Sequence, residues 1–169
     1  MPLEKYLRGL ITFFDLPMSY NYAGPALQPA FVLANNIKTR VWICYEIAYS
    51  DLVAKESKNI DFLTTISNDT WFGRTIGPNQ HLQIAQMRAL ESGKYLVRVA
   101  NSGITAVISN KGVIEQQLPQ FTATSLSASI PLLKGATPYS HWGSMPIILF
   151  CLFLLVIALI QCKISHQLD

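Results

Sequence analysis

The apolar positions divide the chain into a mixed N-terminal part and a continuous apolar run near the C-terminus. The run Met145–Cys162 is apolar on every side, and no Asp, Glu, Lys or Arg lies between Lys134 and Lys163. At 1.5 Å per residue, a helix of this length covers roughly 27 Å, close to the hydrocarbon thickness of a bilayer. A helix that is apolar all round is typical of a membrane span, the alternative being a helix buried in a large core. We therefore expect a transmembrane helix over residues 141–163.

Residues 1–140 instead show short apolar stretches separated by turn signals, which is typical of an α/β domain. β-Branched and aromatic runs predict strands, and apolar residues on one face of 79–93 predict a helix that ends at Gly93. An amphipathic helix is expected over residues 2–14. The strands are expected at residues 39–45, 61–67, 95–100, 104–109, 113–118 and, less regularly, 126–132.

Composition narrows the class of protein. Of the 169 residues, half are hydrophobic and only 14% are charged, which excludes a disordered chain and agrees with a membrane contribution. The net charge of +3 is small and dispersed, so no nucleic-acid partner is expected. The three cysteines show no CxxC or paired His/Cys spacing, so the sequence indicates no zinc site, no disulfide framework and no cofactor.

Cys44 is the one candidate nucleophile. It ends a predicted strand at a transition to a helix, whose N-terminus would favour the thiolate; inert packing in a core is the alternative. Glu46 is either a base or orienting group, or a capping or solvated carboxylate. No histidine pairs with Cys44 by a spacing rule, and His81 is expected to open a helix. Cys151 lies in the apolar run and is expected to be inert.

The segment after the second predicted strand combines turn residues with large aromatics. Asn68 and Asp69 are typical of a turn. Trp71 and Phe72 precede Gly73, so they form either a plug in the core or an exposed apolar lip for a lipid chain.

Motifs in the same order along nearly the whole chain resemble the apolipoprotein N-acyltransferases of bacterial inner membranes. The motifs are Ile43–Ile47 (ICYEI), Ile66–Gly73 (ISNDTWFG), Gly77–Pro78, His81–Leu82, Met87–Glu91 (MRALE), Arg98–Thr105 (RVANSGIT), Gly112, Leu118–Phe121 (LPQF) and Thr137–Tyr139 (TPY). The extramembrane part of that family belongs to the nitrilase (carbon-nitrogen hydrolase) superfamily. The resemblance implies an α/β fold: a partial nitrilase-like α-β-β-α sandwich over 1–140, followed by one C-terminal transmembrane helix.

The resemblance also implies chemistry. Cys44 would be the catalytic nucleophile, supported by Tyr45 and Glu46, with substrate bound by the loop Trp71–Gly73. The cysteine would take an acyl group from a membrane phospholipid as a thioester and pass it to the N-terminal diacylglyceryl-cysteine of an apolipoprotein. The implied place is the bacterial inner membrane, with the nitrilase-like domain on the periplasmic side and residues 164–169 as a cytoplasmic tail.

The sequence departs from the family's Glu-Lys-Cys triad. The Glu and Lys lie upstream of the segment that the chain's first residues resemble, and Lys38, Lys55 and Lys94 do not match the catalytic position. We therefore expect the C-terminal part of such an enzyme, inactive alone, with the missing N-terminal part as a partner. The alternatives are a membrane-anchored nitrilase-like amidase and a non-catalytic remnant.

Overall fold

The computed structural model describes the backbone of residues 28–168 and the side chains of residues 28–161 and 163. The helix predicted over 2–14 lies outside the described residues. The elements are β1 (Phe31–Val32), β2 (Lys38–Ile43), α2 (Ser50–Glu56), β3 (Phe62–Asn68), α3 (Gly77–Ser92), β4 (Leu96–Asn101), β5 (Ala106–Ile108), β6 (Ile114–Gln117), α4 (Pro138–Trp142) and α5 (Met145–Leu168). Short 3-10 helices lie between them, among them η2 (Cys44–Ala48) and η4 (Thr70–Phe72).

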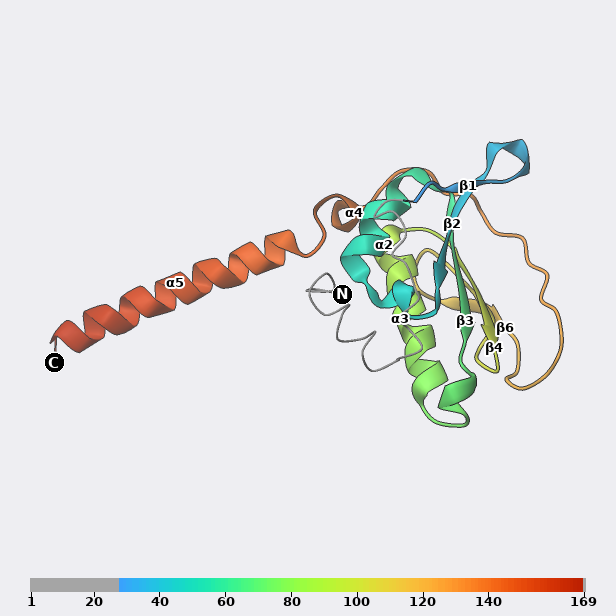
Figure 1. The fold of residues 1–169 in the computed structure, drawn as a ribbon. Coiled ribbons are helices and arrows are strands. Elements are labelled where there is room, and N and C mark those ends of the chain that lie inside the picture. The colour runs from blue at the N-terminus through green and yellow to red at the C-terminus, as the bar shows by residue number, and fades with distance from the viewer. Residues whose placement is uncertain (1–27, 169) are drawn as a thin grey trace, which may run out of the picture.

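The described strands form one six-stranded mixed sheet in chain order, from β1 to β6. β2, β3 and β4 are parallel, and the outer pairs are antiparallel. Parallel neighbours need a crossover, which α2 and α3 supply (Figure 1). Because Ile43 pairs with Ile66 and Ile66 with Val99, the carboxyl ends of the three parallel strands meet at one edge.

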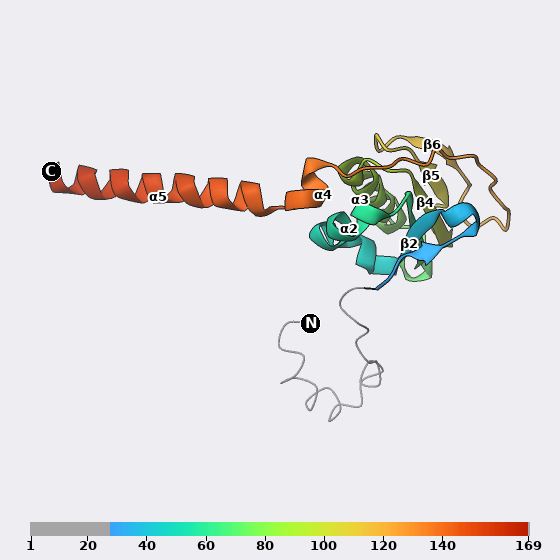
Figure 2. The same cartoon turned by 90° about the horizontal axis from the view of Figure 1, so that it is seen from above.

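One face of the sheet carries the core. α2 and α3 lie together on that side in Figure 2, where their buried residues pack against alternate residues of the strands. The core includes Trp42, Leu63, Leu96 and Ile108 from the strands and Val53, Leu82, Ala85 and Ala89 from the helices. On the other face Ile43, Ile66 and Val99 are 64%, 48% and 46% exposed, so this face of the parallel strands stays open.

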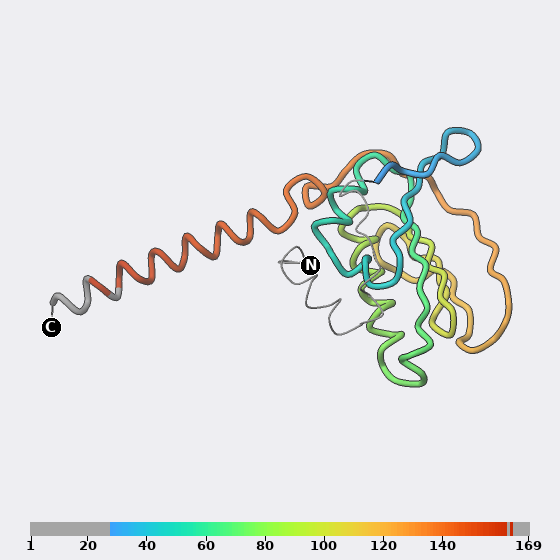
Figure 3. Tube along the Cα trace, in the orientation of Figure 1, coloured from blue at the N-terminus to red at the C-terminus, as the bar shows by residue number. Residues whose placement is uncertain are grey.

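The segment between β6 and α4 lies against β4 and β5 without regular structure. Figure 3 shows it running along the sheet before it returns to α4. With β4 and β5, residues 118–130 line a cavity of about 800 Å³. The strand predicted at 126–132 is therefore wrong: these residues form no ladder, and Pro131 has no N–H to donate to one.

The other predicted strands and the helix over 79–93 are confirmed to within a few residues. Gly93 ends α3 at a φ of 65°, a conformation that glycine adopts without strain. β2 ends at Ile43, one residue before Cys44.

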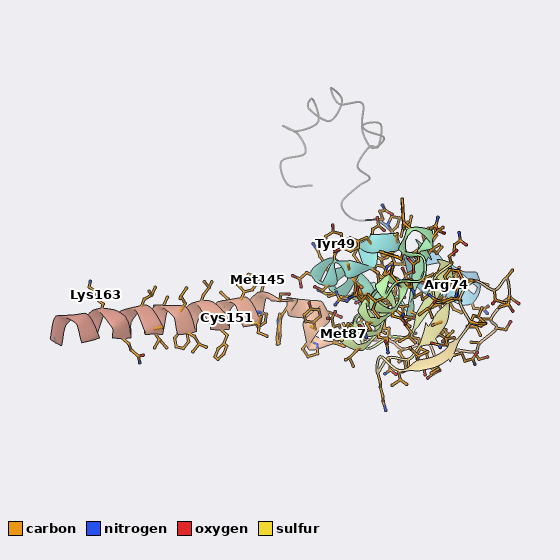
Figure 4. All side chains as sticks on the ribbon, turned by 90° about the horizontal axis from the view of Figure 1, so that it is seen from below. Tyr49, Arg74, Met87, Met145, Cys151 and Lys163 are labelled. Carbon is orange, nitrogen blue, oxygen red and sulfur yellow. The ribbon has the colours of Figure 1, made fainter. Side chains whose placement is uncertain are left out.

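α5 extends away from the domain in both ribbon views (Figures 1 and 2). Figure 4 shows its side chains, Cys151 and Lys163 among them, along the protruding helix. Within the described residues, no helix meets the combined length and hydropathy needed to span a bilayer. The transmembrane helix expected over 141–163 therefore stays a prediction.

Candidate active site

Cys44 lies at the sheet edge where the parallel strands end. Cys44 directly follows β2 and is the first residue of η2, where its φ is 52°. This left-handed region is unfavourable for a residue with a side chain. The thiol is a free one and is partly exposed, with Ser67 Oγ 3.8 Å from its Sγ. Cys44 is thus held in a tight turn at the surface rather than sealed in the core.

Glu46 fixes the turn that carries Cys44. Its Oε2 accepts a hydrogen bond from the backbone N–H of Ile43 at 2.8 Å, and its carbonyl accepts one from Tyr49 at 3.2 Å. These contacts are those of a capping carboxylate that also orients the turn. Tyr45 is 64% exposed, and its ring meets that of Tyr49 edge to face, with 5.8 Å between centroids.

A buried polar cluster lies behind Cys44, contributed by the end of β3, by α3 and by β4. Asp69 Oδ2 accepts from Arg98 Nη2 at 2.7 Å, and Asp69 Oδ1 lies 3.0 Å from His81 Nδ1. Ser67 Oγ donates to the same Oδ1. The opposite ring nitrogen, His81 Nε2, lies 3.2 Å from the carbonyl oxygen of Cys44. The cluster therefore connects β4 to the backbone of Cys44.

Arg98 is fully buried in this cluster. Burial lowers the pKa of its guanidinium, and the neighbouring Asp69 and Cys44 act in the opposite direction. Its Nε donates to the carbonyl of Ile104 at 3.1 Å. Gly103 lies against the same carboxylate, where an added Cβ would collide with Asp69 Oδ2. The loop after β4 therefore requires a residue without a side chain here.

Local sequence patterns do not reveal this cluster. Asp69 has the pattern of a turn residue, and no spacing rule joins His81 to Cys44. The structure brings His81 to the carbonyl of Cys44 across 37 residues of sequence. A charged residue inside the apolar run 95–100 was the available signal, since an arginine buried in a strand requires a partner.

The loop after β3 presents aromatic side chains at the same edge. Asn68 Oδ1 accepts from the backbone N–H of Thr70 at 3.2 Å, which confirms the predicted turn chemistry. Trp71 is 84% exposed and Phe72 39%, and Gly73 has a φ of 53°. Trp71 is therefore no core plug, and the exposed lip is the arrangement that the structure shows.

The three lysines set aside in the sequence lie elsewhere. Lys94 precedes β4, at the opposite end from Cys44, and its Nζ donates to the carbonyl of Leu133 at 2.8 Å. Among the described side chains, no group of three or more His, Cys, Asp and Glu could hold a metal ion. The chemistry that this edge offers is that of a thiol able to attack a carbonyl carbon beside an apolar lip.

Comparison with known proteins places these residues in a family. Residues 11–136 match the family model of the carbon-nitrogen hydrolases. The chain is 47% identical over 165 residues to the apolipoprotein N-acyltransferase of Pseudomonas syringae pv. tomato, covering 98% of this chain and 32% of that protein. It is 46% identical over 151 residues to the enzyme of the same name from Vibrio cholerae, covering 89% and 30%.

The chain thus spans about a third of the length of the curated relatives that it matches. Among solved structures, an amidase of the nitrilase superfamily from Nesterenkonia AN1 matches with a TM-score of 0.44 and 18% identity, covering 60% of this chain and 42% of that one.

Proposed function

The chain belongs to the carbon-nitrogen hydrolase family, with the nitrilase-like α/β fold, and we propose that it is the cysteine-bearing part of an apolipoprotein N-acyltransferase. Its identity to enzymes of that name over nearly its whole length supports the proposal. The observation that carries it is the position of Cys44, partly exposed in a left-handed turn at the edge where the parallel strands end. A packing cysteine needs neither the exposure nor the unfavourable backbone.

The proposed reaction has two covalent steps. The Cys44 thiolate attacks the ester carbonyl carbon of a membrane phospholipid, an S–C bond forms, and the ester C–O bond breaks to release a lysophospholipid that takes a proton. The α-amine of a diacylglyceryl-cysteine then attacks the thioester, the C–S bond breaks, and the amine loses a proton. Each step needs a base and an oxyanion donor, which the resemblance assigns to polypeptide preceding this part.

The neighbouring residues support Cys44 in distinct ways. Glu46 fixes the turn through the backbone N–H of Ile43, and Tyr45 lies exposed beside the thiol-bearing residue. The lip of Trp71 and Phe72 offers apolar surface for the acyl chains, and Gly73 allows the loop to reverse. Trp71, Phe72 and Gly73 are the proposed substrate contacts, and Tyr45 and Glu46 are the supporting residues.

The domain boundaries are also part of the proposal. Residues 1–140 form the C-terminal portion of a nitrilase-like domain, and its open sheet face becomes the inner layer of an α-β-β-α sandwich when the partner polypeptide covers it. The exposed apolar Ile43, Ile66 and Val99 suit burial against a second sheet.

The C-terminal helix is proposed as a membrane anchor over residues 141–163, with residues 164–169 in the cytoplasm and the domain in the periplasm. Its apolar side chains point outward, Ile147 and Phe153 being 69% and 61% exposed. Trp142, which is 66% exposed, lies at the end of the proposed span nearest the domain, where interfacial aromatic residues are favoured. Lys163 lies at the other end, where a positive charge on the cytoplasmic side is favoured. Phospholipid donor, apolipoprotein acceptor and bilayer would then meet at one surface of the inner membrane.

A chimera tests the function. This chain replaces the matching third of the Pseudomonas syringae enzyme, and acyl transfer from phospholipid to a diacylglyceryl peptide is measured. We expect the chimera to acylate, the 169-residue chain alone not to, and Cys44→Ser in the chimera to lower the rate at least about a thousandfold. Mass spectrometry should find the acyl adduct on Cys44.

Cys151→Ser is the matched control and should leave the rate unchanged. Full activity of the Cys44→Ser chimera contradicts the proposal. Hydrolysis of a small amide without acyl transfer would contradict the proposal and indicate a membrane-anchored amidase. A chimera that folds but has no activity would contradict it too and indicate that the chain is a non-catalytic remnant.

A further inference from the structure

Two side chains hold the backbone around Cys44, one from the same turn and one from α3. On one side, Glu46 accepts from the N–H of the preceding residue, Ile43. On the other, His81 Nε2 lies 3.2 Å from the carbonyl oxygen of Cys44 itself. Since the φ of 52° is unfavourable for a cysteine, contacts of this kind are needed to keep the turn populated.

The direction of the His81 contacts follows from its partners. The carbonyl oxygen of Cys44 can only accept a hydrogen bond. Asp69 is also an acceptor, because its two oxygens already take a guanidinium N–H from Arg98 and the hydroxyl of Ser67. His81 therefore donates through Nε2 to the carbonyl oxygen of Cys44, while its Nδ1 lies 3.0 Å from Asp69 Oδ1.

Burial makes this arrangement rigid. His81 is 4% exposed, and Asp69 and Arg98 are fully buried. The ring cannot turn without leaving a buried carboxylate oxygen with one donor fewer, which is costly away from water. Arg98 is in turn fixed through its Nε, which donates to the carbonyl of Ile104. The cluster thus forms a continuous path from β4 to the turn that presents Sγ.

We propose that His81, oriented by Asp69, is a positioning residue that holds Cys44 in its left-handed turn and so aims the thiol at the substrate. The inference rests on the proposed function of Cys44 as nucleophile. His81 acts through the backbone and not as a base, because its ring contacts the carbonyl oxygen of Cys44 rather than Sγ.

The test measures the reactivity of Cys44 in the full chain. Alkylation by iodoacetamide is followed by peptide mass spectrometry, which distinguishes Cys44 from the other cysteines. His81→Leu should lower the rate about tenfold, since the released backbone returns to negative φ and turns the Cα–Cβ bond away from the edge. That factor corresponds to about 1.4 kcal/mol, within the range estimated for a left-handed residue with a side chain.

His81→Gln should restore the rate to within about threefold of the wild type, because its amide nitrogen can still donate to the carbonyl of Cys44. Ile60→Val is the control for general destabilisation: Ile60 is buried just before β3, at the opposite end of the sheet. It should leave the alkylation rate unchanged. An unchanged or faster rate in His81→Leu overturns the proposal, as does equal slowing in Ile60→Val.

The same variants in the chimera separate positioning from binding. His81→Leu should lower kcat about tenfold and leave KM unchanged, and His81→Gln should recover most of kcat. Alkylation needs neither phospholipid nor the partner polypeptide, so its failure is distinct from failure of the proposed acyl transfer. A rise in KM with kcat intact would make His81 a binding residue and refute the positioning function.

Discussion

Arg98 and Asp69 are both fully buried, and Arg98 Nη2 lies 2.7 Å from Asp69 Oδ2. Each charge can be buried only because the other pairs with it. Two charges out of water are tolerated when they pair closely and hydrogen bond further, whereas one charge left alone is strongly destabilising. Gly103 belongs to the same arrangement, because it leaves room for the Asp69 carboxylate. The residues behind Cys44 therefore stabilise the fold and shape the site through the same contacts.

Arg98→Leu should lower the free energy of unfolding by about 3–5 kcal/mol, since it leaves the carboxylate of Asp69 buried without its cation. Arg74→Leu is the control: Arg74 is exposed in the loop before α3, where its guanidinium carbon lies 5.1 Å from the centroid of the Phe121 ring. Its loss should cost about 1 kcal/mol or less. Urea denaturation measures both, and equal losses would contradict the argument.

The elements were largely predictable because each has a local cause. β2 and β3 are apolar runs bounded by polar turns, and α3 ends at a glycine in the left-handed conformation. The irregular segment 126–132 shows where this fails, because Leu126 and Ile130 alternate like strand residues but no neighbouring strand accepts them. A strand exists only through its partner, which the local pattern does not contain.

The site was predictable only in part, for the same reason. Cys44, Tyr45 and Glu46 are consecutive in one turn, so the pattern and the resemblance identify them together. His81 and Arg98 reach that turn only through the parallel pairing of β2, β3 and β4. The link of His81 to a backbone carbonyl leaves no motif in the sequence, since any residue supplies a carbonyl.

Lys94 hydrogen bonds to the irregular segment between β6 and α4. Its burial predicts that the free energy of unfolding depends on pH. Burial lowers its pKa below the ordinary value of 10.5, and Asp61 acts in the opposite direction. Between the lowered pKa and 10.5 the unfolded chain binds more protons than the folded one, so stability rises with pH in that window. Lys94→Met should remove this rise, as measured by urea denaturation at a series of pH values.

Lys111→Met is the control for that series, because Lys111 is exposed in the turn before β6. It should keep the rise with pH seen in the wild type. A rise of equal size in Lys94→Met would show that another group is responsible.

The molecule as a whole combines a small folded domain with a long helix whose apolar surface faces outward. Asp51 on α2 joins the two, since its Oδ1 accepts from the backbone N–H of Ser144 at 3.0 Å and from Tyr139 at 3.2 Å. The helix therefore begins from a fixed point on the domain. A lipid surface is the environment that would cover its side chains, as the proposed function requires.

Flotation with phospholipid vesicles tests that environment. The full chain should float with the vesicles, and Leu152→Arg should lower the bound fraction strongly, because an arginine at the centre of a membrane helix costs about 2.5–3.5 kcal/mol. Val113→Arg is the matched control, placing the same charge at a position of the domain that is 58% exposed. It should float like the wild type, since Val113 lies outside α5 and the aromatic lip, where lipid contact is expected. Equal flotation of Leu152→Arg and the wild type would contradict the anchor and leave Trp71 and Phe72 as the contacts with lipid.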